Sequence, residues 1–316
     1  LLPGLLEEPV VGSRRPIVSA HDFGVLSGIP MMAAVSWTTA ERTWNTVARN
    51  ASPYAGAILS RSPEKIAQRV REIAGKHDLP LTPSEIAQQL VTFEIETAMQ
   101  IIRGHAPMRW VPDISIEGEA NLETALSAGR GAILWDSHFY FASLITKMGL
   151  YRKGYRLHHM SRREHGFSPT HFGIRLLNPV RTSIEARYLA DRVVMPEDNP
   201  GAILDDLARL LASNEVVSIT VRGDSNRPVE APFLDGAARI APGAPVLSWN
   251  SQSALLPVFT KRIDDFRYRV RISPPINVLD NTTRRDAVVS AAQEYARRLE
   301  AEVIEHPGQW IDWINI

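Results

Sequence analysis

The spacing of apolar residues changes near residue 110. Before that point the clearest pattern is helical: Ile86, Leu90, Phe93 and Ile101 recur at roughly helical spacing after Pro83-Ser84, and Gly104 ends the run. Residues 107–112 contain two prolines and read as a connector. The first part of the chain is therefore predicted to be helical.

After residue 110, short apolar runs alternate with amphipathic stretches. We predict strands at 114–116, 131–136, 155–160, 216–221, 255–260 and 268–272, and helices at 119–128, 139–148, from 199 and at 283–305. This alternation predicts an α/β fold with a mostly parallel central sheet flanked by helices. We expect a single domain over 1–316, with 1–110 as an N-terminal helical layer and 111–316 as the α/β core.

Composition narrows the classes of function. With 35 basic and 35 acidic residues the formal charge is zero, so no overall field attracts nucleic acid. The absence of cysteine excludes disulfides, thiol nucleophiles and Cys-ligated metals. The longest apolar stretch, Phe23 to Trp37, is too short to span a bilayer and contains Pro30. It is either a buried core helix or a segment resting in the lipid interface.

The turn after the apolar run GAILWD places a histidine where a strand ends and a helix begins. In open α/β sheets, sites lie at such turns, which makes His138 the first candidate. A helix N-terminus disfavours an added proton, so the imidazole can act as a base. The alternative is a structural histidine. Ser137 precedes it, but the G-x-S-x-G elbow is absent, which leaves a serine hydrolase as a weaker alternative.

Basic residues gather between 138 and 181. Five of the nine histidines lie at 138–171, seven Arg or Lys lie at 152–181, and only Glu164 opposes them. Such a block suits an anionic ligand such as a lipid phosphate, a phosphopantetheine arm or an acidic carrier protein, or it is a solvated face. The histidines lack the HExxH spacing, so no metal site is expected. The stretch GAARIAPG at 236–243 either lines a groove for an acyl chain or packs between elements.

Several segments, taken in order, resemble one known family. GAILWDSHFYFASL is similar to the strand–His–helix signature of the lipid A late acyltransferases and the related phosphatidylinositol mannoside acyltransferases. Further similar segments are TWNTVARNASP, SITVRGDSNRP, APFLDGAARIAPGAPVLSW, LLPVFTKRIDDFRYRVRISPPI and EHPGQWIDW. Together they cover roughly residues 20 to 316.

The resemblance implies an O-acyltransferase in which His138 deprotonates a hydroxyl that attacks an acyl-carrier-protein or acyl-CoA thioester. The acceptor is a lipid, a glycolipid or a specialised metabolite, and no cofactor is needed. Arg162 and Asp224 match family positions, and Arg163 accompanies them as a candidate substrate-binding residue. The implied location is the cytoplasmic face of the inner membrane, or the cytoplasm if the acceptor is soluble.

One departure concerns the carboxylate that orients the histidine. The family has Asp or Glu five residues after it, where this chain has Ser143, and Ser161 stands at a second acidic position. Serine carries no charge to favour an imidazolium. Three explanations follow: Asp136 has taken over the role, Glu164 reaches in, or the protein is a non-catalytic paralogue that binds lipid or carrier. We take His138 and Asp136 as the candidate catalytic pair, with Ser143 and Glu164 near the substrate.

Overall fold

A mixed seven-stranded sheet forms the centre of the computed structural model, which describes residues 15–314 apart from 54–61, 197–198, 200, 224, 226, 266 and 281–282. The strand order is β1-β9-β8-β2-β5-β3-β4. The strands are β1 (Asp113–Glu117), β2 (Ala132–Asp136), β3 (Leu157–Ser161), β4 (Leu189–Val194), β5 (Val216–Thr220), β8 (Ala254–Arg262) and β9 (Arg267–Ile272). The five adjacent strands from β8 to β4 all run parallel, so the predicted mostly parallel α/β fold is confirmed.

Strand β2 lies in the middle of the sheet. All five of its residues are buried, and it pairs in parallel with β5 on one side and β8 on the other. Burial on both faces explains why AILWD is continuously apolar until Asp136, with no polar alternation. The chain that leaves this strand therefore emerges at the centre of the sheet's carboxyl edge.

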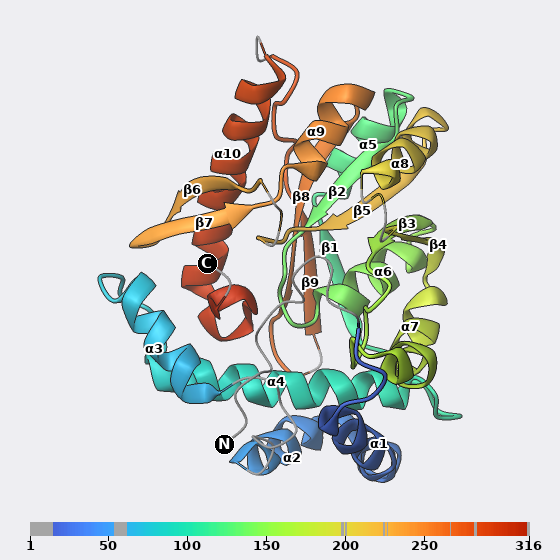
Figure 1. Cartoon of the computed structure of the whole chain (residues 1–316), viewed down its shortest axis with the longest axis vertical. Coiled ribbons are helices and arrows are strands. Elements are labelled where there is room, and N and C mark those ends of the chain that lie inside the picture. Colours follow the sequence, from blue (N-terminus) through green and yellow to red (C-terminus); the bar gives the residue numbers. More distant parts are fainter. Residues whose placement is uncertain are drawn as a thin grey trace.

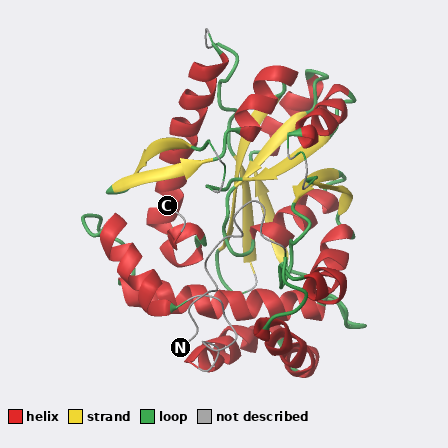
Figure 2. Cartoon of the chain, in the orientation of Figure 1, coloured by secondary structure: helices red, strands yellow, loops and turns green. Residues whose placement is uncertain are grey.

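Helices cover both faces of the sheet (Figures 1 and 2). On one face Trp135 packs on Tyr295, with ring centroids 4.3 Å apart. On the other face Thr146 shares a hydrogen bond of 2.7 Å with Thr260. The helices of this α/β region are α5 (Glu119–Ser127), α6 (Ala142–Arg152), α7 (Asn178–Ala186), α8 (Ala202–Ala212), α9 (Gly243–Ser251) and α10 (Arg284–Glu305). Thus α10 and α6 lie on opposite faces.

The N-terminal region is helical, as predicted, and its centre is the long helix α4 (Pro83–Arg103). A capping box between Thr82 and Glu85 starts it. Helices α1 (Ala20–Thr38), α2 (Trp44–Ala51) and α3 (Pro63–Ala74) pack along α4, which runs beneath the end of the sheet in Figure 1. The Arg103 guanidinium donates to the Ser36 and Trp37 carbonyls at 2.9 Å, which joins α1 to α4.

Helix α1 is not the buried core helix that one interpretation expected. Its buried residues are Asp22, Gly28 and Ser36, while apolar Phe23 and Met31 are 62% and 60% exposed. Within the described ranges, no helix is long and apolar enough to cross a bilayer.

A small antiparallel hairpin lies apart from the main sheet. It comprises β6 (Val229–Phe233) and β7 (Gly236–Ile240), and it packs on α10. The sequence interpretation had no strand here, because residues 236–243 read only as small and apolar. The hairpin matters because its inner residues face the turn that carries His138.

The helix predicted at 139–148 begins later and ends later than expected. Phe139 forms an isolated antiparallel bridge with Trp310, so α6 starts only at Ala142. Gly149 lies inside the helix, where an added Cβ would come within 2.9 Å of Ile114. This glycine therefore permits close packing on β1.

Candidate active site

His138 and Asp312 form a hydrogen-bonded pair at the carboxyl edge of the sheet. The His138 Nδ1 lies 2.8 and 2.9 Å from the two Asp312 carboxylate oxygens. The two side chains are 28% and 16% exposed, so the pair is reachable from solvent. A carboxylate can only accept, so Nδ1 is the nitrogen that donates, and in the neutral ring Nε2 then keeps a free lone pair.

The C-terminal segment is bound to the His138 turn through its backbone. The Ile311 N–H donates to the His138 carbonyl, and the Tyr140 N–H donates to the Gln309 carbonyl, both at 3.0 Å. Gln309 is anchored in turn, because its side-chain amide makes two hydrogen bonds of 2.8 Å to the Arg262 backbone. This pairing holds Asp312 beside His138, although the two residues are 174 positions apart in the chain.

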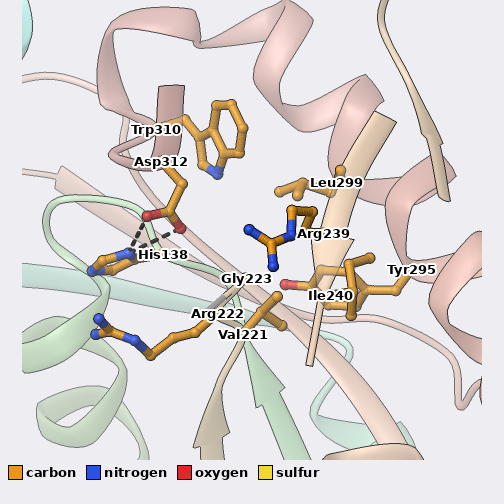
Figure 3. A pocket seen from close by; sticks show the side chains of 11 residues that line it. His138, Val221, Arg222, Gly223, Arg239, Ile240, Tyr295, Leu299, Trp310 and Asp312 are labelled. Carbon is orange, nitrogen blue, oxygen red and sulfur yellow. Dashed lines mark hydrogen bonds and ion pairs between the residues drawn. The ribbon is translucent and has the colours of Figure 1, made fainter. Parts of the chain in front are cut away.

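A small cavity of about 30 Å³ lies beside this pair (Figure 3). Its lining comes from the His138 turn, the end of β5, the hairpin strand β7, helix α10 and the C-terminal segment. The lining residues are His138, Val221, Arg222, Gly223, Ala238, Arg239, Ile240, Tyr295, Leu299, Trp310 and Asp312. Strand β7, within the 236–243 stretch, supplies three of them, while the expected acyl-chain groove stays a prediction.

Asp136, which we expected to orient His138, makes different contacts. Ser218 Oγ donates to Asp136 Oδ2 at 2.5 Å, and His159 Nδ1 lies 2.9 Å from the same hydroxyl. Strand β2 ends at Asp136 and the chain then turns, so the two residues do not share one strand face. Burial raises the pKa of the Asp136 carboxyl to about 7, opposed by the Ser218 hydrogen bond and the Lys147 charge.

Ser143, at the position of the family acid, joins a buried charged cluster. Arg181 Nη2 donates to Ser143 Oγ at 2.8 Å, and Arg181 Nε donates to Glu185 at 2.9 Å. Lys147, which is 2% exposed, donates to Glu185 at 2.6 Å, and His165 lies 3.1 Å from it. Burial alone would raise the pKa of Glu185, but Lys147, His165 and Arg181 lower it well below its usual value.

The basic residues after β3 lie away from the cavity lining. Arg162 and Glu164 come within 3.9 Å of each other, and Arg15 approaches the same carboxylate at 3.7 Å. Neither Arg162, Arg163 nor Glu164 is among the described residues that line the cavity. Asp224 lies outside the described residues, so its expected role stays a prediction.

The clustered histidines have separate partners. His158 Nε2 lies 3.6 Å from Glu215, while His159 contacts Ser218 and His165 contacts Glu185. Burial lowers the pKa of His159 well below its ordinary value, which keeps that ring neutral. In the part of the chain that the structure describes, no group of three acidic or histidine side chains is placed to hold a metal ion.

Asp312 is the functional candidate that sequence reasoning missed. It lies within EHPGQWIDW, a segment noted only for its similarity to the family. The available signal was an acidic residue in an element otherwise apolar from Trp310 to Ile314. Without the backbone pairing between 138–140 and 309–311, nothing in the sequence brings it to His138.

Comparison with known proteins identifies the family of the chain. The family model described as bacterial lipid A biosynthesis acyltransferase matches residues 84–315, which is well over half of the chain and includes both His138 and Asp312. No curated protein sequence gives a significant match. The chain therefore belongs to the bacterial lipid A biosynthesis acyltransferase family and is an acyltransferase.

Proposed function

We propose that the protein transfers a fatty acyl group from an acyl-carrier-protein or acyl-CoA thioester to a hydroxyl of a lipid, a glycolipid or a specialised metabolite. His138 is the general base, and Asp312 is the residue that positions it. The observation that carries this proposal is the pair of hydrogen bonds, 2.8 and 2.9 Å, between the His138 ring and the Asp312 carboxylate.

The pair has the tautomer that base catalysis needs. With Nδ1–H held by Asp312, the Nε2 lone pair accepts the proton of the acceptor hydroxyl. The hydroxyl oxygen then bonds to the thioester carbonyl carbon. When the carbon–sulfur bond breaks, the thiolate leaves and takes the proton from the imidazolium. Asp312 holds the ring in place and stabilises its positive charge between these two proton transfers.

Asp312 also accounts for the missing family acid. Ser143 contacts Arg181 and so belongs to the buried cluster around Glu185. In this proposal the Asp312 carboxylate of the C-terminal segment takes the orienting role that the resemblance places five residues after His138. This supports an active enzyme over a paralogue that only binds lipid or carrier.

The exposed face of α1 is the proposed membrane contact. From Phe23 to Thr38 the helix contains no charged side chain, and Phe23, Leu26, Met31 and Trp37 are 62%, 48%, 60% and 45% exposed. Apolar and tryptophan side chains of this kind partition into the bilayer interface. We propose a peripheral protein on the cytoplasmic face of the inner membrane, where a thioester donor meets a lipid acceptor.

The test is acyl transfer by purified protein from acyl-CoA and acyl-carrier-protein donors to a panel of hydroxylated lipids, with vesicles present. His138→Ala should abolish transfer, while His171→Ala, at an exposed histidine away from the cavity, should keep it. Undiminished transfer by His138→Ala would reject the assignment. Binding of donor or lipid without any transfer by the natural protein would support the paralogue.

A further inference from the structure

Two buried hydrogen-bond donors in the cavity beside His138 have no acceptor. The Trp310 indole Nε1 and the Tyr295 hydroxyl find no partner in the described part of the chain. Both side chains are buried, at 2% and 0% exposure, and both line the cavity. An unsatisfied buried donor costs about 1–3 kcal/mol, so two in one cavity call for a functional explanation.

The third donor of the cavity carries a full charge. Arg239 of β7 also lines the cavity, although its side chain is exposed, and no described carboxylate lies within ion-pair distance of its guanidinium. Glu230 is its cross-strand partner in the hairpin register, yet the two form no ion pair. Figure 3 shows the Arg239 guanidinium, the Trp310 nitrogen and the Tyr295 oxygen directed toward the same space.

The chemistry of this space suits one negatively charged oxygen. Asp312 is the only carboxylate among the described residues that line it, and that carboxylate is already hydrogen-bonded to His138. About 30 Å³ is enough for a single oxygen atom with its neighbours, and too small for an acyl chain. Burial, and after it the charges of the Asp136, Asp312 and Glu302 carboxylates, raise the pKa of Tyr295 well above its ordinary value, so its hydroxyl stays protonated and able to donate.

The cavity is also held in a fixed relation to the proposed base. The backbone of Trp310 forms an isolated antiparallel β-bridge with Phe139, the residue after His138. Ala241, directly after β7, donates its N–H to the Arg222 carbonyl at 2.8 Å, which joins the hairpin to the end of β5. Trp310 packs on Phe233 of β6, with ring centroids 5.1 Å apart. The donors therefore belong to the same rigid assembly as the His138–Asp312 pair.

We propose that this cavity is the oxyanion site of the acyl transfer, with Trp310 and Tyr295 as hydrogen-bond donors and Arg239 as the opposing charge. This inference rests on the proposed function. When the acceptor oxygen bonds to the thioester carbon, the carbonyl electron pair moves onto oxygen, and the donors stabilise that negative charge. The pair returns to re-form the carbonyl as the carbon–sulfur bond breaks.

The central test compares Tyr295→Phe with Tyr268→Phe. Tyr295→Phe removes an unpartnered hydroxyl, so kcat should fall about 10²-fold with little change in KM and no loss of stability. Tyr268, also buried, accepts a hydrogen bond of 2.9 Å from Gln100 away from the cavity. Tyr268→Phe should therefore lower the unfolding midpoint and leave kcat unchanged. Trp310→Phe and Arg239→Gln should each lower kcat about as much as Tyr295→Phe.

A binding measurement separates this inference from the proposed function. Dodecylphosphonate carries its charge on tetrahedral oxygens, while dodecanol has the same chain without charge. Isothermal titration should show tighter binding of the phosphonate by the natural protein, and a loss of that preference of about tenfold or more in Tyr295→Phe and Arg239→Gln. Equal affinity for the two probes, or a preference and a kcat that survive in Tyr295→Phe, overturns the oxyanion site. Absence of transfer with an intact phosphonate preference overturns only the proposed reaction.

Discussion

Replacement of Asp312 by asparagine is the sharpest perturbation of the proposed mechanism. The substitution keeps the size of the side chain but removes the negative charge that faces His138 Nδ1 at 2.8 Å. The amide can also present its NH₂ group to the ring, which favours the tautomer with the proton on Nε2. In that tautomer the ring cannot accept the acceptor's proton. We therefore expect kcat to fall while substrate affinity changes little.

The size of the effect follows from the geometry of the pair. Two unit charges about 3 Å apart interact by roughly 1.5 to 5 kcal/mol for effective dielectric constants between about 80 and 20. The Asp312 side chain is 16% exposed and His138 is 28% exposed, so solvent screens part of this interaction. We expect a loss of about 10²- to 10³-fold in kcat, below the roughly 10⁴-fold loss seen when a fully buried triad carboxylate is replaced.

The assay is steady-state acyl transfer measured beside thermal unfolding, so that loss of fold is separated from loss of chemistry. Asp136→Asn is the matched control, because Asp136 contacts Ser218 in place of the His138 ring. It should keep most of the natural kcat. Full activity in Asp312→Asn, together with a large loss in Asp136→Asn, would show that Asp136, and not Asp312, orients His138.

Three further predictions concern stability. The pKa of Asp136 is raised to about 7 in the folded protein, so the native state keeps a proton that the unfolded chain releases near pH 4. The free energy of unfolding that this proton contributes is therefore present at low pH and falls as the pH rises from about 4 to 7. Asp136→Asn should remove that decline, so urea unfolding at pH 8 should show it more stable than the natural protein, and a less stable variant would contradict the shift. Glu185→Gln leaves the buried Lys147 unpaired and should cost about 3–5 kcal/mol in urea unfolding, whereas a cost below about 1 kcal/mol would argue against the ion pair. Gly118 has φ +74° and an added Cβ would lie 2.1 Å from the Ile272 carbonyl, so Gly118→Ala should lower the melting temperature by several degrees, and an unchanged value would rule out that contact.

Much of the fold could be predicted because its elements follow local rules. The continuous apolar run before Asp136 identifies the central strand, and the spacing from Ile86 to Ile101 identifies α4. The hairpin β6–β7 was missed because residues 236–243 are mostly small and the hairpin lies outside the main sheet, packed on α10. The late start of α6 was missed because Phe139 pairs with the distant Trp310, and no local pattern records such a contact.

The site was predicted only in part, because one of its two residues has a local signal in the sequence and the other does not. His138 could be found because it directly follows a buried strand, which is a local signal. Its partner could not, because Asp312 reaches the ring only through backbone pairing between two segments far apart in the chain. Asp136 lies only two positions before His138 in the sequence, but the strand ends there and the Asp136 side chain contacts Ser218.

The most direct test of the His138–Asp312 pair is the protonation state of the His138 ring, observed by ¹⁵N-resolved NMR of the protein with labelled histidine. We predict a neutral ring with its proton on Nδ1, a strongly downfield Nδ1–H resonance, and loss of that resonance in Asp312→Asn. A His138 ring with its proton on Nε2, or an Nδ1–H resonance that Asp312→Asn leaves unchanged, would contradict this prediction.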